Sequence, residues 1–179
     1  MLEAEPFLGL DIASTSPAFL AFLACHVVAA IVAIVGGLMA MLARKGSVRH
    51  RAAGRTYLIA VWIVFLTACV MAAFRWIDDY PLIVTGAVAA GSATFGFLYR
   101  RLHRPGDAPH IVAMSLSYVA MLTAFYVDNG PHLPIWNLLP PIAFWFLPAI
   151  VGLPLTIRAI RRARRRAAQG LPGRSTVGQ

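Results

Sequence analysis

Residues 44–57 read RKGSVRHRAAGRTY and place five basic residues between two long apolar runs. The apolar runs cover residues 17–43 and 57–74. A transmembrane helix requires about 20 mostly apolar residues to cross about 30 Å of hydrocarbon, and both runs are close to that length. The stretch therefore predicts the charged tip of a membrane hairpin, from which the rest of the chain can be oriented.

The composition indicates a membrane protein. Of the 179 residues, 59% are hydrophobic and only 13% are charged, whereas soluble domains carry nearer to a quarter of charged residues. The net charge of +9 does not indicate nucleic-acid binding, because the basic residues sit at the ends of apolar runs and not on one soluble face. We therefore expect lipid, and no nucleic acid, as the surrounding partner.

The hydrophobic pattern predicts an all-α fold, a polytopic membrane helix bundle with five transmembrane helices. The chain divides into an outer N-terminal segment (residues 1–16), a single transmembrane bundle (residues 17–157) and an arginine-rich cytoplasmic tail (residues 158–179). Pro148 and Pro154 interrupt the last span, so the pattern leaves open whether that helix is continuous or kinked. The five predicted spans are residues 17–43, 57–74, 80–99, 109–127 and 139–157.

The distribution of charge predicts the orientation of the bundle. Fifteen of the 16 Lys and Arg residues lie in the first loop, the third loop and the tail, and six of the seven acidic residues lie on the opposite side. Cytoplasmic loops are enriched in Lys and Arg, so we expect the N-terminus outside and the C-terminus inside a bacterial inner (cytoplasmic) membrane, crossed several times. The arginine-rich tail is expected to bind anionic lipid headgroups at about 1 kcal/mol per basic residue.

Histidines in or near the spans are the residues most suited to chemistry, because no common soluble-enzyme motif occurs. His26 lies about 13 Å below the outer end of the first span, where an ionisable residue suggests function; the alternative is a neutral side chain hydrogen-bonded to a neighbouring helix. His50 and His110 both lie near the cytoplasmic boundary. Two neutral imidazoles facing each other suit the iron of haem b, whereas His50 alone also suits lipid phosphates.

Arg51 and Arg55 are four residues apart and share a helix face. Two guanidinium groups beside Gly54 would form an anion- or lipid-binding site, which we extend to Tyr57. The alternative is that these arginines only determine topology. The two cysteines, Cys25 and Cys69, lack metal-ligand spacing, so the sequence gives no certain metal site.

These residues together resemble a known pattern: a histidine before a helix of small residues, the element His-Arg-x-x-Gly-Arg-x-Tyr at residues 50–57, and His110 with Met114 at the start of a later span. The pattern is similar to a bacterial family of predicted membrane proteins that carries a domain of unknown function, over about residues 20–155. The resemblance supplies no activity. It implies that a set of residues acts together, namely His26, His50, Arg51, Gly54, Arg55, Tyr57 and His110.

Three hypotheses of function follow. The first is a small redox protein that holds haem b or a quinone with the histidines at the inner rim, with His26 as a third candidate. The second is a non-catalytic accessory or assembly subunit, which would dock in a larger membrane complex or a homo-oligomer through small-residue faces on spans one and three. The third is a transporter or proton pathway through His26; transporters usually contain internal repeats, and the sequence suggests none.

Overall fold

The computed structural model describes residues 6–7, 10–11, 16–73 and 76–169. Its main elements are five long helices, each long and apolar enough to cross a membrane. The predicted all-α architecture with five candidate spans is therefore confirmed. The five helices are α1 (Pro17–Leu42), α2 (Val48–Ala72), α3 (Trp76–Arg101), α4 (Ala108–Asn129) and α5 (Pro141–Gln169).

Short elements accompany the helices. Two strands of two residues each, β1 (Pro6–Phe7) and β2 (Leu10–Asp11), pair in antiparallel fashion before α1. The 3₁₀ turns η1 (Gly130–His132) and η2 (Trp136–Leu138) connect α4 to α5.

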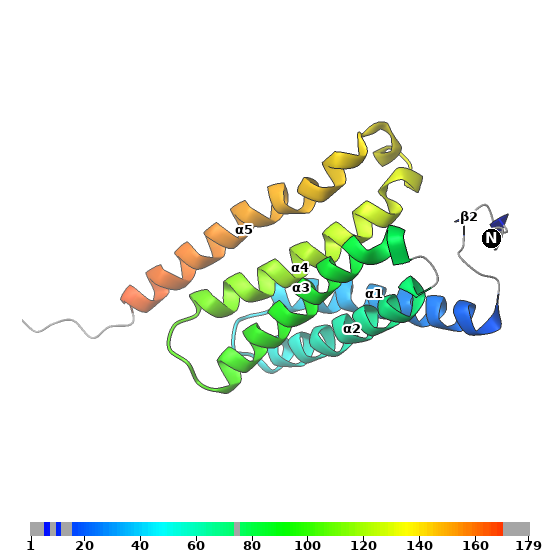
Figure 1. Ribbon diagram of the computed structural model, residues 1–179. Coiled ribbons are helices and arrows are strands. Elements are labelled where there is room, and N and C mark those ends of the chain that lie inside the picture. The colour runs from blue at the N-terminus through cyan, green and yellow to red at the C-terminus, as the bar shows by residue number, and fades with distance from the viewer. Residues whose placement is uncertain (1–5, 8–9, 12–15, 74–75, 170–179) are drawn as a thin grey trace, which may run out of the picture.

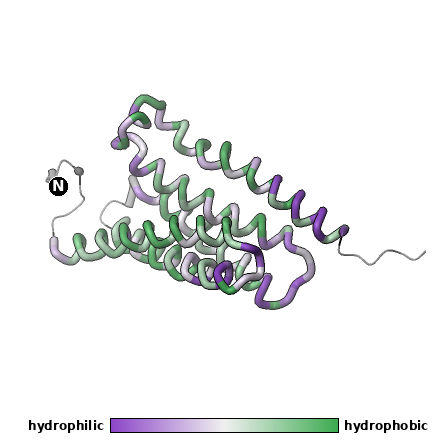
Figure 2. The backbone as a smooth tube through the Cα atoms, turned by 180° about the vertical axis from the view of Figure 1, so that it is seen from behind, coloured by the Kyte–Doolittle hydropathy of each residue, from purple (hydrophilic) through white to green (hydrophobic). Residues whose placement is uncertain are grey.

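Successive helices run up and down and contact each other in chain order, α1 with α2, α2 with α3, α3 with α4, and α4 with α5 (Figure 1). The α1–α2 loop, the α3–α4 loop and the C-terminal part of α5 consequently lie at one end of the bundle (Figure 1). Figure 2 shows that this end is also the most hydrophilic. We call it the basic rim and define it as residues 43–51 and 100–110.

Helix α2 begins earlier than the apolar run at residue 57 suggests. Ser47 is the N-cap, and its side-chain oxygen accepts a hydrogen bond of 3.1 Å from the backbone N–H of His50. Such a cap stabilises a helix start by about 1 kcal/mol. Arg49 and Arg51 of the rim therefore lie in the first turns of α2, where they are helical although they are not apolar.

Helix α5 is continuous from Pro141 to Gln169, although Pro148 and Pro154 lie inside it. The predicted end of the fifth span at residue 157 is not a helix end. No turn residue follows that position, and arginine and alanine are good helix formers, so the basic segment 158–169 extends the same helix. Residues 170–179, the last part of the predicted tail, lie outside the described residues.

Small residues bring α1 close to its neighbours. Gly36 and Gly37 are buried, and a Cβ at Gly36 would lie 3.4 Å from the backbone nitrogen of Tyr57. Without a Cβ, helices approach closely and gain van der Waals contact, which drives helix association in lipid. The core of the bundle is accordingly built mainly from small side chains, with its largest cluster formed by Ala33, Tyr57, Ala60, Val61, Ala89, Ala93, Ala120 and Met121.

We predict that Gly37→Val destabilises the bundle by about 1–3 kcal/mol, the usual range for overpacking. A Cβ at residue 37 would lie 2.4 Å from the Tyr118 ring, and moving that ring would break the 3.1 Å hydrogen bond from its hydroxyl to the Ile34 carbonyl. Thermal unfolding in detergent measures the effect.

Gly91→Ala is the matched control for this substitution. A Cβ at Gly91 meets no atom within 4 Å, and alanine favours helix over glycine by about 1 kcal/mol. We therefore expect an unchanged or higher midpoint for the control. Equal midpoints for Gly37→Val and the native protein would contradict the packing described.

Candidate functional site

His50 and His110 meet at the basic rim. Each is the third residue of its helix, α2 and α4 respectively. Their ring centroids are 6.3 Å apart and the ring planes are inclined by 77°. Both side chains are half-buried. The structure therefore brings together the two histidines that the sequence placed at the same level.

Each imidazole is fixed by its Nδ1 atom. His50 Nδ1 lies 2.9 Å from the Ala40 carbonyl oxygen on α1, and His110 Nδ1 lies 2.8 Å from the Gly96 carbonyl oxygen on α3. A carbonyl oxygen only accepts hydrogen bonds, so both Nδ1 atoms carry the proton. In a neutral imidazole the other nitrogen, Nε2, then keeps its lone pair. Histidines that bind metals are commonly oriented in this way.

The local sequence explains why these carbonyls are within reach. Ala40 and Gly96 have small side chains and are buried, so an imidazole from the next helix can approach the backbone. Ala40 also belongs to the last turn of α1, whose carbonyls have few partners within the helix. His50 therefore also has a structural role, because it donates a hydrogen bond to the C-terminal end of α1.

The surroundings of the pair are mainly cationic. Arg100 donates to Asp107 through a 2.8 Å contact between Nη1 and Oδ1, and the charges of Arg100 and Lys45 act on the His110 ring. Desolvation lowers the pKa of the Lys45 side chain, and the Asp107 carboxylate opposes this shift. The rim thus combines the two Lewis-basic Nε2 atoms with positive charge. This combination suits a metal cofactor whose organic part carries anionic groups.

Open space lies beside His50. A Cβ at Gly54 would meet no atom within 4 Å, and Gly54 lies one turn after His50 on the same helix face. Ala53 on α2 and Ala113 on α4, three residues after the two histidines, are buried and small. Bulky side chains therefore do not occupy this part of α2.

His26 lies elsewhere. Its Nδ1 is 3.0 Å from Thr67 Oγ1, and that hydroxyl donates its proton to the Ile63 carbonyl at 2.7 Å, so His26 is the donor of the pair. His26 precedes Ala40 by fourteen residues on α1, which corresponds to about 21 Å along the helix. The structure does not bring it to His50 and His110. It matches the predicted alternative of a histidine bonded to a neighbouring helix.

The four residues of the expected anion site point in different directions. Arg51 and Arg55 are exposed, and Arg51 Nη1 donates to the Gly46 carbonyl at 2.5 Å. Tyr57 is instead fully buried. Gly54 lies between them, on the side of His50. The two arginines share an outer surface, but the hydroxyl of Tyr57 is not presented to it.

A buried polar cluster lies two helical turns further into the bundle. The Tyr57 hydroxyl and Ser117 Oγ are 2.6 Å apart, and Tyr118 donates to the Ile34 carbonyl, so the cluster joins α1, α2 and α4. No sequence motif links Tyr57 with Ser117. The only sequence signal for the pair is spacing, because each residue follows a rim histidine by seven positions.

A family model for predicted membrane proteins, DUF2306, matches residues 23–157. The chain belongs to this family. The match confirms the resemblance to a membrane-protein family of unknown function. The DUF2306 region contains His26, His50 and His110 together with the whole element His-Arg-x-x-Gly-Arg-x-Tyr. No curated protein and no solved structure shows significant similarity to the chain.

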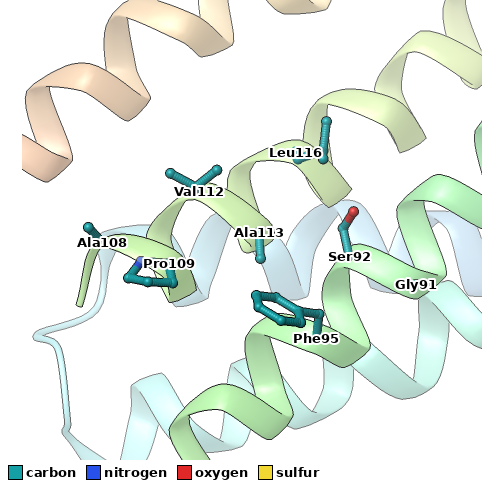
Figure 3. A pocket seen from close by; sticks show the side chains of 8 residues that line it. All are labelled: Gly91, Ser92, Phe95, Ala108, Pro109, Val112, Ala113 and Leu116. Atoms are coloured by element: carbon teal, nitrogen blue, oxygen red, sulfur yellow. The ribbon is translucent and has the colours of Figure 1, made fainter. Parts of the chain in front are cut away.

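The DUF2306 region also contains an apolar groove on its outer surface, between α3 and α4 (Figure 3). His110 is not among its lining residues, so the groove is separate from the histidine pair. Among the described residues, no group of three or more His, Cys, Asp or Glu side chains is placed to hold a metal ion. The groove is lined by Gly91, Ser92, Phe95, Ala108, Pro109, Val112, Ala113 and Leu116.

We predict that His50 and His110 are Nδ1–H tautomers when neutral, because both Nδ1 atoms face carbonyl oxygens. Nitrogen-15 NMR of histidine-labelled protein at alkaline pH measures this directly, with signals assigned by His50→Gln and His110→Gln. His103, exposed in the α3–α4 loop, is the control and should show the Nε2–H tautomer that solvated histidine prefers. An Nε2–H signal from either rim histidine would refute the arrangement.

Proposed function

We propose that this DUF2306 protein is a small redox protein of the membrane and binds haem b between His50 and His110. The observation that carries the proposal is the histidine pair itself, with both Nδ1 atoms tied to backbone carbonyls and both Nε2 atoms left as Lewis bases. Bound haem would supply one-electron chemistry, and the chain would position the iron and tune its surroundings.

The number of ligands favours haem over a bare metal ion. Haem iron already has four porphyrin nitrogens and takes its axial ligands from the protein, whereas a zinc site needs three or four protein ligands. The ring centres of His50 and His110 are 6.3 Å apart, so the two imidazoles are close enough to hold one haem together.

The charge and packing at the rim support the same ligand. Haem b carries two propionate carboxylates, and Lys45 and Arg100 supply positive charge beside His110. A haem near the lipid headgroups would direct its propionates to this cationic end and its apolar edge into the bundle. Gly54 and its small neighbours leave room on the side of His50.

A quinone fits less well. The carbonyl oxygens of an oxidised quinone require hydrogen-bond donors, but the neutral Nε2 atoms of His50 and His110 only accept. The pair would suit the hydroxyl groups of a reduced quinol and lose those contacts on oxidation. We therefore place haem first and quinone second as the ligand of the rim.

The accessory-subunit hypothesis depended on small-residue faces of spans one and three as docking surfaces, and these faces are not exposed. Ala33 and Gly37 on α1 and Ala93 on α3 are buried inside the bundle, so these small-residue faces pack within the chain. Docking to a larger complex or to a second copy would have to use other, lipid-facing side chains.

The hypothesis of a proton pathway is not favoured either. Among the described residues, His26 bonds to Thr67 and Tyr57 bonds to Ser117, and no hydrogen bond joins these two pairs. Thr67 follows Tyr57 by ten residues, or about 15 Å of helix. The described side chains therefore do not form a continuous polar path along this face.

We further propose that the basic rim faces the cytoplasm, in the inner membrane of a bacterium. The support is the concentration of Lys and Arg in the first loop, the third loop and the C-terminal part of α5. Anionic headgroups would contact the arginines of residues 158–169 at about 1 kcal/mol each.

Protein purified from haem-replete cells is expected to show a Soret band and a reduced-minus-oxidised α-band. His50→Ala and His110→Ala should each abolish the α-band, because each removes one axial ligand. His26→Ala and His132→Ala are matched controls, since both lie far along the chain from the pair, and should keep the spectrum. A folded, colourless native protein would refute the haem proposal.

For the topology, we expect a C-terminal green fluorescent protein fusion to be fluorescent and a C-terminal alkaline phosphatase fusion to be inactive. The same reporters fused after Ala73, at the opposite end of α2 from the rim, should give the reverse pattern. An active phosphatase at the C-terminus would show that the rim faces outward.

A further inference from the structure

The two hairpins α1–α2 and α3–α4 have the same plan. Helix α2 starts at Val48 and α4 at Ala108, sixty residues later, and the N-cap residues Ser47 and Asp107 are separated by the same interval. His50 and His110 also differ by sixty. Corresponding positions of α2 and α4 therefore share a helix start, a cap position and a histidine.

Burial follows the same correspondence. The four buried residues nearest the rim on α2 are each sixty positions before a buried residue of α4. Three buried residues of α1 likewise have buried counterparts in α3, 56 residues later. One of these pairs is Ala40 and Gly96, whose carbonyl oxygens accept the hydrogen bonds from His50 and His110. The pairs are Ala53 and Ala113, Tyr57 and Ser117, Ala60 and Ala120, Val61 and Met121 on α2 and α4, and Ala33 and Ala89, Gly37 and Ala93, Ala40 and Gly96 on α1 and α3.

The chain thus contains a structural repeat, which the sequence alone does not suggest. The accepting carbonyl and the histidine are 10 residues apart in the first copy and 14 in the second, which hides the repeat in the sequence. Because α2 and α4 start at the same rim, the copies run in parallel, as in one class of membrane-protein repeats. Equivalent residues face each other: His50 meets His110, and Tyr57 meets Ser117.

We propose that Tyr57 and Ser117 are positioning residues, which hold the two repeats in the register that presents His50 and His110 to each other. The role of this register in ligand binding rests on the proposed function. The inward-facing positions 50, 53, 57 and 60 of α2 are spaced by three, four and three residues, as in a heptad repeat. Tyr57 follows His50 by seven residues and therefore occupies the equivalent heptad position. A polar residue at one such position is known to specify register.

The burial of the pair makes the register specific. Tyr57 and Ser117 are both 0% exposed and their oxygens are 2.6 Å apart. A slip of α4 by one turn, about 5.4 Å, would leave both hydroxyl groups unpaired, at about 1–3 kcal/mol for each. The neighbouring Ala60, Ala120 and Val61 would tolerate such a slip, because apolar contacts are not directional.

The bond acts on the histidines through the helices that carry them. Tyr57 and Ser117 each lie seven residues, or about 10 Å, beyond the rim histidine of the same helix. Tyr118 adds a bond from α4 to α1 through the Ile34 carbonyl. In the described part of the chain, no second side-chain hydrogen bond joins α2 and α4.

The test measures the register directly, without requiring haem. Spin labels at Arg49→Cys on α2 and Val112→Cys on α4, both exposed, are placed in a background of Cys25→Ser and Cys69→Ser, and pulsed electron paramagnetic resonance gives their distance. We expect one narrow distance in the labelled parent. Tyr57→Phe and Ser117→Ala should each add a second component, displaced by up to about one helical turn of 5.4 Å.

Two variants separate positioning from general stability. The double variant Tyr57→Phe with Ser117→Ala removes both polar groups, so it should regain most of the stability that either single change loses, yet keep the broadened distance. Ser117→Thr retains the hydroxyl and should restore the single distance. An unchanged distance distribution in folded Tyr57→Phe and Ser117→Ala would overturn the proposal.

Spectroscopy of the same variants links register to the site. In haem-loaded protein, Ser117→Ala should lose part of its low-spin signal in favour of high-spin iron, and Ser117→Thr should not. If the distance broadens while the parent protein binds no haem, the positioning role holds and the proposed function fails. If the parent binds haem and neither distance nor spin state changes, the proposed function holds and the positioning role fails.

Discussion

The hydrogen bond between the Tyr57 hydroxyl and Ser117 Oγ is the constraint on which the interior of this bundle depends. In lipid the helices gain little from the hydrophobic effect, so close packing of small residues and a few polar contacts must determine how they fit. Alanine and glycine allow α1 to approach α2 and α3 to approach α4. They do not specify one register, and the buried hydroxyl pair between α2 and α4 does.

The histidine pair follows from the same arrangement. Two copies of one hairpin face each other, and each copy donates an imidazole Nδ1–H to the backbone of its own preceding helix. This fixes both rings and leaves both Nε2 atoms as Lewis bases near positive charge. The DUF2306 match, residues 23–157, contains every paired position of the repeat, and the proposed haem site would lie where the two copies meet.

Much of this could be predicted from the sequence. The spans follow from apolar run length, the start of α2 from Ser47, and the meeting of His50 and His110 from their equal depth. Hydropathy ends the fifth span at residue 157, but the end of α5 at Gln169 follows from helix-forming Arg and Ala residues and from Gly170 and Pro172 after them. The separation of Tyr57 from Arg51 and Arg55 depends on helix rotation, which charge alone does not reveal. The repeat is hard to detect in the sequence because equivalent positions carry different residues, such as Tyr57 and Ser117, and because the loops differ in length.

The proposed site can be tested by the ratio of haem b to protein in the native chain purified from haem-replete cells, measured by the pyridine haemochrome method. One site with two imidazoles predicts one haem b per chain. A ratio near zero in folded protein with both rim histidines intact would refute the haem site.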